Sequence, residues 1–178
     1  DARIGLFTNN IEVAFRHKLD RNRLAQALNI ILDAQPILGC RLVIKGMNIY
    51  WARLNKKEWD SLYLLQDSQE YEKFKTLQVD SRTGPQTMLG LYNTPEGDKL
   101  IIKASHQVGD GGGLHDIARE LSCIYNRLKH EPAYQPEPNI NGSRSGKQII
   151  RQIPWTAIPV IMANFIKLIW SNNHPKVT

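Results

Sequence analysis

The stretch KASHQVGDGGGLHDI, residues 103–117, joins an apolar, strand-like run to an amphipathic helical pattern. Within this stretch His106 follows the apolar run, Asp110 comes four residues later, and three glycines follow the aspartate. Glycine loses the most backbone freedom on folding, so three in succession indicate either a plain turn or a point where something approaches the backbone closely. The surrounding residues help to distinguish the two.

The residues on either side predict a hairpin before the stretch and a helix after it. The apolar run 99–105 can pair with 86–92 across residues 94–98, whose sequence Thr-Pro-Glu-Gly-Asp is a strong turn signal. Apolar residues then recur at helical spacing over 114–128 and predict a long amphipathic helix that begins near Gly113. His106 is therefore expected at the exit of a strand.

The N-terminal part adds further short elements. Residues 11–19 alternate apolar and polar, which predicts a half-buried strand with His17 on its inner side. Asp20 can cap a helix that runs up to Pro36. The next elements are a hairpin of segments 38–44 and 48–54, and a short helix at 68–75 within the polar stretch 55–79.

This order of elements predicts an α/β (α+β) fold with a mostly antiparallel sheet covered by helices. Residues 1–130 would form one lobe, and 131–152, rich in Pro, Asn, Gly and Ser, a linker or long loop. Residues 153–178 would form an apolar helix, but two prolines and a lysine make its apolar run marginal for a span of about twenty residues. Packing on further protein, absent from this chain, is the favoured interpretation; an interfacial helix is the alternative.

Composition and charge exclude several classes of protein. The 178 residues are 42% hydrophobic and 22% charged, which suits one folded domain rather than a disordered chain. The net charge is +6, but the basic residues are scattered, which argues against nucleic acid and leaves an acidic partner open. Cys40 and Cys123 lie in apolar contexts without a CxxC pair, which predicts buried thiols in a reducing, cytoplasmic compartment and no metal site.

The local chemistry of the stretch allows two interpretations. A histidine whose backbone is held at a strand end is well placed to act as a general base. The aspartate could brace the loop, and the glycines could adopt positive backbone torsions, let a long substrate pass and leave a helix N-terminus free for an anion. The alternative is a turn histidine beside an aspartate that caps the helix.

The stretch resembles the HxxxDG motif of the chloramphenicol-acetyltransferase-like superfamily, which includes condensation domains of peptide synthetases and alcohol and polyketide-associated acyltransferases. The resemblance covers roughly residues 10–130. AQPILGCRLV (34–43) looks like the family's hPxLRxRf element, TGPQTMLGLYN (83–93) like the strand before the motif strand, and LHDIARELSCIYNRL (114–128) like the helix after it. The resemblance implies one lobe of a two-lobed fold.

In this superfamily the residue at His106 is the general base, which takes a proton from a hydroxyl or amine acceptor. The acceptor then attacks a thioester of coenzyme A or of carrier-protein phosphopantetheine, so no tightly bound cofactor is expected. The Asp110 position orients the loop through an arginine partner, and Gly111 permits close packing. Ser105 stands where condensation domains have a first histidine, which favours the branches that depend on acyl-CoA. Ser105 and His17 are possible pocket residues: His17, on the inner side of the first strand, could face the same site, although a core histidine is the favoured interpretation.

The superfamily builds its active site between two lobes, and the second-lobe motif with its DFG-type loop is absent from this sequence. The expected partners are therefore the acyl thioester, the acceptor, a second lobe from the same or another chain, and a carrier protein. Nucleic acid is not expected, and a membrane surface is not favoured. Two alternatives stay open: a non-catalytic binding or scaffold lobe of the same fold, and a module that docks an acidic carrier protein.

Overall fold

The structure, a computed structural model, describes residues 7–140 together with 154, 156, 159 and 160. Within residues 7–140 it contains six strands, three α-helices and two short 3₁₀-helices. In chain order they are β1 (Thr8–Ala14), α1 (Arg21–Ala34), η1 (Pro36–Gly39), β2 (Cys40–Lys45), β3 (Asn48–Arg53), η2 (Lys56–Glu58), β4 (Leu62–Leu65), α2 (Ser68–Thr76), β5 (Thr87–Thr94), β6 (Gly97–Ser105) and α3 (Gly111–Arg127).

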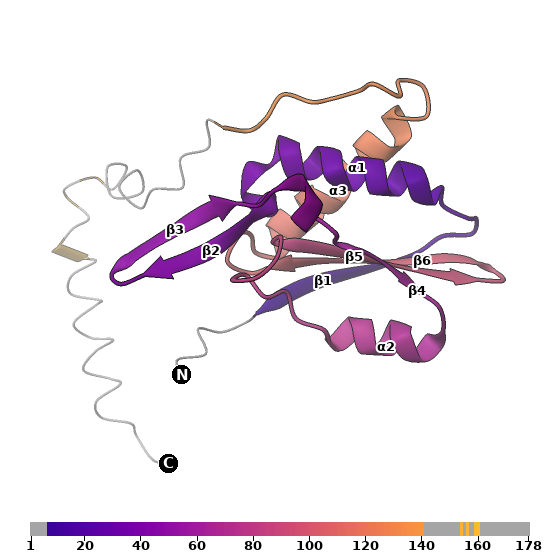
Figure 1. Cartoon of the computed structure of the whole chain (residues 1–178), viewed down its shortest axis with the longest axis horizontal. Coiled ribbons are helices and arrows are strands. Elements are labelled where there is room, and N and C mark those ends of the chain that lie inside the picture. Colours follow the sequence, from indigo (N-terminus) through magenta and orange to yellow (C-terminus); the bar gives the residue numbers. More distant parts are fainter. Residues whose placement is uncertain (1–6, 141–153, 155, 157–158, 161–178) are drawn as a thin grey trace, which may run out of the picture. The chain divides into compact units, whose positions relative to one another are not determined.

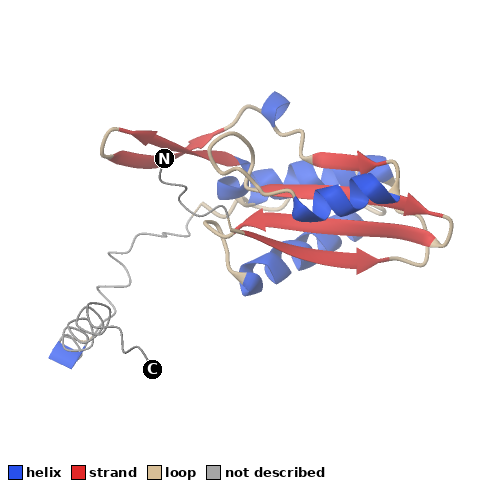
Figure 2. Ribbon diagram, turned by 90° about the horizontal axis from the view of Figure 1, so that it is seen from below, coloured by secondary structure: helices blue, strands red, loops and turns tan. Residues whose placement is uncertain are grey.

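Four of the strands form one sheet in the order β1-β6-β5-β4, shown from two sides in Figures 1 and 2. The pairs β1–β6 and β6–β5 are antiparallel, and β5–β4 is parallel. Strands β2 and β3 form a separate antiparallel hairpin. The predicted α+β class, with a mostly antiparallel sheet, is confirmed. Strand β6, which leads to His106, is held between two neighbours.

Helices cover both faces of the sheet, with α1 and α3 on one side and α2 on the other (Figure 1). Successive residues of a strand point to opposite faces. On β6, Leu100 and Ile102 accordingly join the core with α1 and α3, whereas Ile101 packs with Tyr71 and Phe74 of α2. Each large apolar side chain buried in this way contributes about 1.5–3 kcal/mol. The core therefore anchors β6 from both sides.

Local signals in the sequence account for several of these elements. The Asp20 side chain accepts a hydrogen bond from the Arg23 N–H at 3.0 Å and caps α1, as the sequence predicts. The β5–β6 turn needs a glycine because Gly97 has a φ of 146°, and a Cβ there would collide with the Phe15 carbonyl oxygen. The strong turn signal at 94–98 thus reflects a steric requirement.

Four expectations from the sequence are wrong. Strand β4 lies in the polar stretch 55–79, where no strand was predicted, because its pairing with β5 is between segments far apart in the chain. Strand β1 ends at Ala14, and α3 begins at Gly111, so the first strand is shorter and the last helix longer than predicted. Cys40 is buried, but Cys123 lies on the exposed side of α3.

The compact unit that contains the sheet includes residues up to Ile140, whereas the sequence predicts a lobe that ends at residue 130. Residues 131–140 contain no helix or strand, yet they pack back onto α1. The Asn139 N–H donates to the Ala34 carbonyl at 2.7 Å, and Tyr134 packs on the core beneath the Arg127 guanidinium. The predicted linker residues 141–152, and all but four residues of the predicted helix 153–178, lie outside the described residues.

Candidate functional site

His106 lies directly after the central strand, and its backbone is held from both sides. The Ser105 N–H donates to the Gln86 carbonyl at 2.9 Å, on the β5 side, and the His106 N–H donates to the Phe7 carbonyl at 2.8 Å, on the β1 side. The Val108 N–H then donates to the Ser105 carbonyl at 3.1 Å and closes a turn. The His106 side chain is exposed and forms no hydrogen bond with the described residues. The sheet thus fixes the backbone and leaves the imidazole accessible.

Ser105 is buried beneath this turn. Its Oγ accepts the Gln107 N–H at 3.3 Å, and the neighbouring Asn9 amide donates to the Gly109 carbonyl at 3.2 Å. The Ser105 hydroxyl therefore takes part in shaping the turn that carries His106.

Asp110 is the N-cap of α3. Its Oδ1 accepts the Gly113 N–H at 2.9 Å, and its carbonyl oxygen accepts the Leu114 N–H at 3.0 Å. The expected arginine partner is not found: among the residues that the structure describes, Asp110 forms no ion pair. Its observed contacts match the alternative in which the aspartate caps the helix.

The glycines after Asp110 form the first turn of α3. The expectation of positive torsions there is wrong, because only Gly46 and Gly97 have a positive φ among the described residues. A Cβ at Gly111 would meet no atom within 4 Å outside its chain neighbours and the helix's own backbone. The described part of the chain therefore gives no support to the close packing expected at Gly111.

The structure does not bring His17 to His106. In the β1–β6 register Thr8 is opposite Ser105 and Ala14 is opposite Lys99, so His17, which follows Ala14, lies beyond the other end of β6. At about 3.3 Å per strand residue, the two ends of this pairing are roughly 20 Å apart. His17 is also exposed in a bend and not on the inner side of a strand. Its assignment to a pocket with His106 is not supported.

One charged residue near the site has a role that the sequence analysis missed. Lys103 lies on β6 and is fully buried, and its Nζ donates to the Lys75 carbonyl at 2.8 Å and to the Leu77 carbonyl at 2.9 Å, at the C-terminal end of α2. Burial lowers the pKa of this ammonium. A positive charge at a helix C-terminus is stabilising. The sequence signal was a lysine inside the apolar run IIKAS. Lys103 attaches α2 to the strand that leads to His106.

Neither of two surface hollows along the outer side of α1 includes His106. One, of about 420 Å³, lies between α1 and residues 132–135, and the other between α1 and residues 135–138. Over the described part of the chain, no group of His, Cys, Asp and Glu side chains is arranged to hold a metal ion. No described helix combines the length and apolar character that a bilayer crossing requires.

No protein-family model and no curated protein matches the sequence. Solved structures match the fold. One is the SgcC5 protein from Streptomyces globisporus, in complex with (R)-(-)-1-(2-naphthyl)-1,2-ethanediol and sucrose, with 19% identity and a TM-score of 0.60 over 82% of this chain. The epimerization domain from the third module of tyrocidine synthetase B has 19% identity and a TM-score of 0.62 over 73% of this chain. The first condensation domain of the CDA synthetase has 13% identity and a TM-score of 0.62 over 82%.

The chain has the fold of one lobe of a condensation domain. The resemblance to the chloramphenicol-acetyltransferase-like superfamily is confirmed at the level of the fold. The match covers 35%, 32% and 40% of the three solved chains, so this chain spans about a third of the length of the structures it matches.

Proposed function

We propose that this chain is the lobe of an acyltransferase that carries the general base, His106. The base would take a proton from the hydroxyl or amine of an acceptor, whose oxygen or nitrogen attacks the carbonyl carbon of an acyl thioester. When the tetrahedral intermediate collapses, the carbon–sulfur bond breaks and the thiolate recovers the proton from the imidazolium. The donor would be coenzyme A or the phosphopantetheine of a carrier protein, acting as substrate in the cytoplasm.

One observation carries this proposal: the backbone of Ser105 and His106 is hydrogen-bonded to segments on both sides of the central strand, while the His106 imidazole is exposed. A general base must be held in place and still reach its substrate. The N-cap of Asp110 on α3 supports the other end of the turn.

The fold adds support for the class of reaction. Two of the three structures named above are domains of synthetases, and a further match concerns condensation-domain-mediated chain release from the enacyloxin polyketide synthase. The complex of SgcC5 with an ethanediol favours a hydroxyl over an amine as the acceptor. Because the chain spans about a third of these structures, we further propose that a second lobe, from the same or another chain, completes the site.

The test is thioester turnover by the full-length protein with His106→Ala. We expect the rate to fall about 10²–10⁴-fold, the usual effect of removing a general base. His115→Ala is the matched control because His115 is also exposed, on the first part of α3, and should leave the rate unchanged. Thermal melts of both variants establish that the fold is retained. Wild-type turnover by a folded His106→Ala variant would refute the proposed role.

A second candidate is a non-catalytic binding or scaffold lobe. The role of Asp110 favours this candidate, because Asp110 caps α3 and forms no ion pair with the described residues, as in an ordinary strand-to-helix turn. It predicts that thioester and acceptor bind equally well to wild type and His106→Ala, and that neither protein catalyses thioester turnover. Equilibrium binding measured beside the turnover assay distinguishes the two functions.

A further inference from the structure

The β2–β3 hairpin exposes large apolar side chains where a soluble surface usually has polar ones. Met47, in the turn, is 100% exposed, and Ile49 is 65% exposed; Ile44 and Tyr50 are exposed as well. The hairpin is a two-stranded sheet of its own, and Figure 1 shows it projecting from the body of the lobe. Contiguous exposed apolar surface of this kind usually marks an interaction site.

The apolar residues occupy both faces of the hairpin as well as its tip. Residues directly opposite each other in an antiparallel pair share a face. Ile44 is opposite Ile49, and Val43 is opposite Tyr50, so these two pairs lie on opposite faces, with Met47 beyond them in the turn. A partner with one flat face would cover only one of the pairs. The tip fits a medium that can surround it.

The charge of this region is uniformly positive. Residues 34–57 include Arg41, Lys45, Arg53, Lys56 and Lys57, and no acidic residue. Two of these side chains, Arg53 and Lys56, form ion pairs with Asp33. Within the described part of the chain, Arg41 and Lys45 form none. Both lie on the hairpin, and both are exposed.

We propose that the hairpin tip, defined as residues 43–50, inserts into the interface of an anionic lipid bilayer. Within the tip, Ile49 and Ile44 lie two and three residues from Met47, or roughly 7–10 Å at the rise of a strand, which matches the usual burial depth of interfacial segments. Arg41 lies three residues further along β2, about 10 Å back, where lipid phosphates can meet its guanidinium. Lys45, close to the tip, can extend its long side chain back to the headgroups.

The experiment places a fluorescent probe on the tip itself. In the 178-residue chain, Met47→Cys is combined with Cys123→Ser and labelled with an environment-sensitive dye; the wild-type chain labelled at its exposed Cys123 is the matched control. We expect the emission at position 47 to shift to the blue with vesicles of phosphatidylcholine plus phosphatidylserine and to stay unchanged with phosphatidylcholine alone. The label at Cys123 should not respond to either vesicle.

Two variants test the contributions separately by vesicle sedimentation. Replacing Lys45 by glutamine should weaken binding to anionic vesicles about fivefold, the effect of one basic residue near the surface. Ile49→Asp should weaken binding at least tenfold and, because Ile49 is exposed, leave the melting temperature unchanged. An aqueous spectrum at position 47 on anionic vesicles, or an equal response to neutral vesicles, would overturn the proposal. A blue shift that appears without vesicles as protein concentration rises would indicate a second copy instead, and would overturn it too.

Discussion

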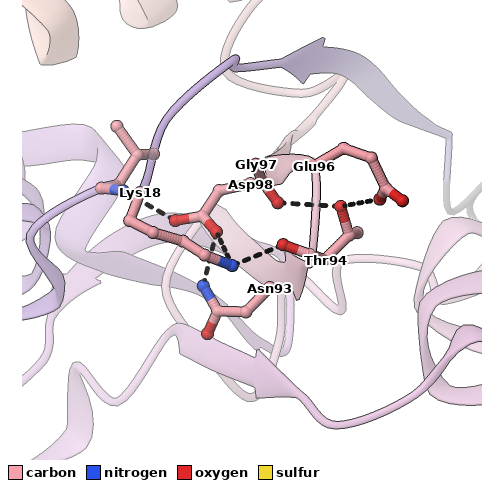
Figure 3. Close-up of polar contacts among 7 residues, drawn as sticks. Lys18, Asn93, Thr94, Glu96, Gly97 and Asp98 are labelled. Carbon is pink, nitrogen blue, oxygen red and sulfur yellow. Dashed lines mark hydrogen bonds and ion pairs between the residues drawn. The ribbon is translucent and has the colours of Figure 1, made fainter.

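Replacing Asp98 with alanine should strongly destabilise the lobe, although Asp98 lies far from His106. The Asp98 side chain is fully buried in the β5–β6 turn and accepts hydrogen bonds from the Leu19 N–H at 2.7 Å and from the Asn93 amide at 2.8 Å. The Lys18 ammonium lies 3.3 Å from Oδ1 of the same carboxylate. Figure 3 shows how this carboxylate joins the turn to the segment between β1 and α1.

The size of the effect follows from these contacts. A hydrogen bond to a charged group contributes about 1.5–3 kcal/mol, and the buried Asp98 carboxylate accepts two, from half-buried Leu19 and from exposed Asn93. The Lys18 side chain is 57% exposed, so its ion pair adds less than about 1 kcal/mol. Asp98→Ala should therefore lower the free energy of unfolding by about 3–5 kcal/mol, whereas Lys18→Met should lower it by less than about 1 kcal/mol.

The loss should also depend on pH. Burial alone would raise the pKa of Asp98, but the hydrogen bonds from Asn93 and Leu19 and the Lys18 ammonium together hold the pKa below its ordinary value of 3.8. A carboxyl whose pKa is lower in the folded state contributes stability above its unfolded pKa and loses it as pH falls through the folded value. The gap between wild type and Asp98→Ala should shrink below about pH 4.

The assay is urea unfolding of wild type, Asp98→Ala and Lys18→Met, followed by tryptophan fluorescence at neutral and acidic pH. A cost of less than about 1 kcal/mol for Asp98→Ala at neutral pH would refute the reasoning, because an exposed carboxylate would account for it. A gap that does not shrink in acid would show that the carboxylate's charge is not what stabilises the turn.

Three further outcomes follow from the same structure. Asp110→Ala should lower the stability measured in thermal melts by about 1 kcal/mol through loss of the α3 N-cap, whereas Asp110→Asn should retain most of that stability. Equal losses in the two variants would contradict capping. Gly111→Ala should leave the melting temperature unchanged or higher, because no neighbour lies within 4 Å of the added methyl group, and a clear drop would reveal an unseen contact. Because burial lowers the Lys103 pKa below its ordinary 10.5, the unfolded chain binds more protons as pH approaches 10.5 from below. Stability to urea should therefore rise with pH in that range, and Lys103→Met should flatten the rise.

The sequence by itself determined the elements that depend on neighbouring residues. The N-cap at Asp20, the helical spacing of α1 and α3, and the turn at 94–98 are local signals, and each element appears where the sequence predicts it, within a few residues. Their order was enough for the α+β class, whereas the resemblance to the superfamily rested on the HxxxDG stretch and on the segments 34–43, 83–93 and 114–128. The position of His106 at a strand exit was also local, because it needed only the apolar run before it.

Only the tertiary structure decided which distant segments meet. Strand β4 is four residues long, and its parallel pairing with β5 leaves no pattern in its own sequence. The antiparallel register of β1 and β6 separates His17 from His106, although the alternation of residues 11–19 had suggested a shared side. In the sequence, Lys103 only interrupts an apolar strand. In the folded chain, its ammonium donates hydrogen bonds to carbonyl groups at the end of α2. Pairing and burial depend on contacts across the chain, and those contacts are not encoded in any single segment.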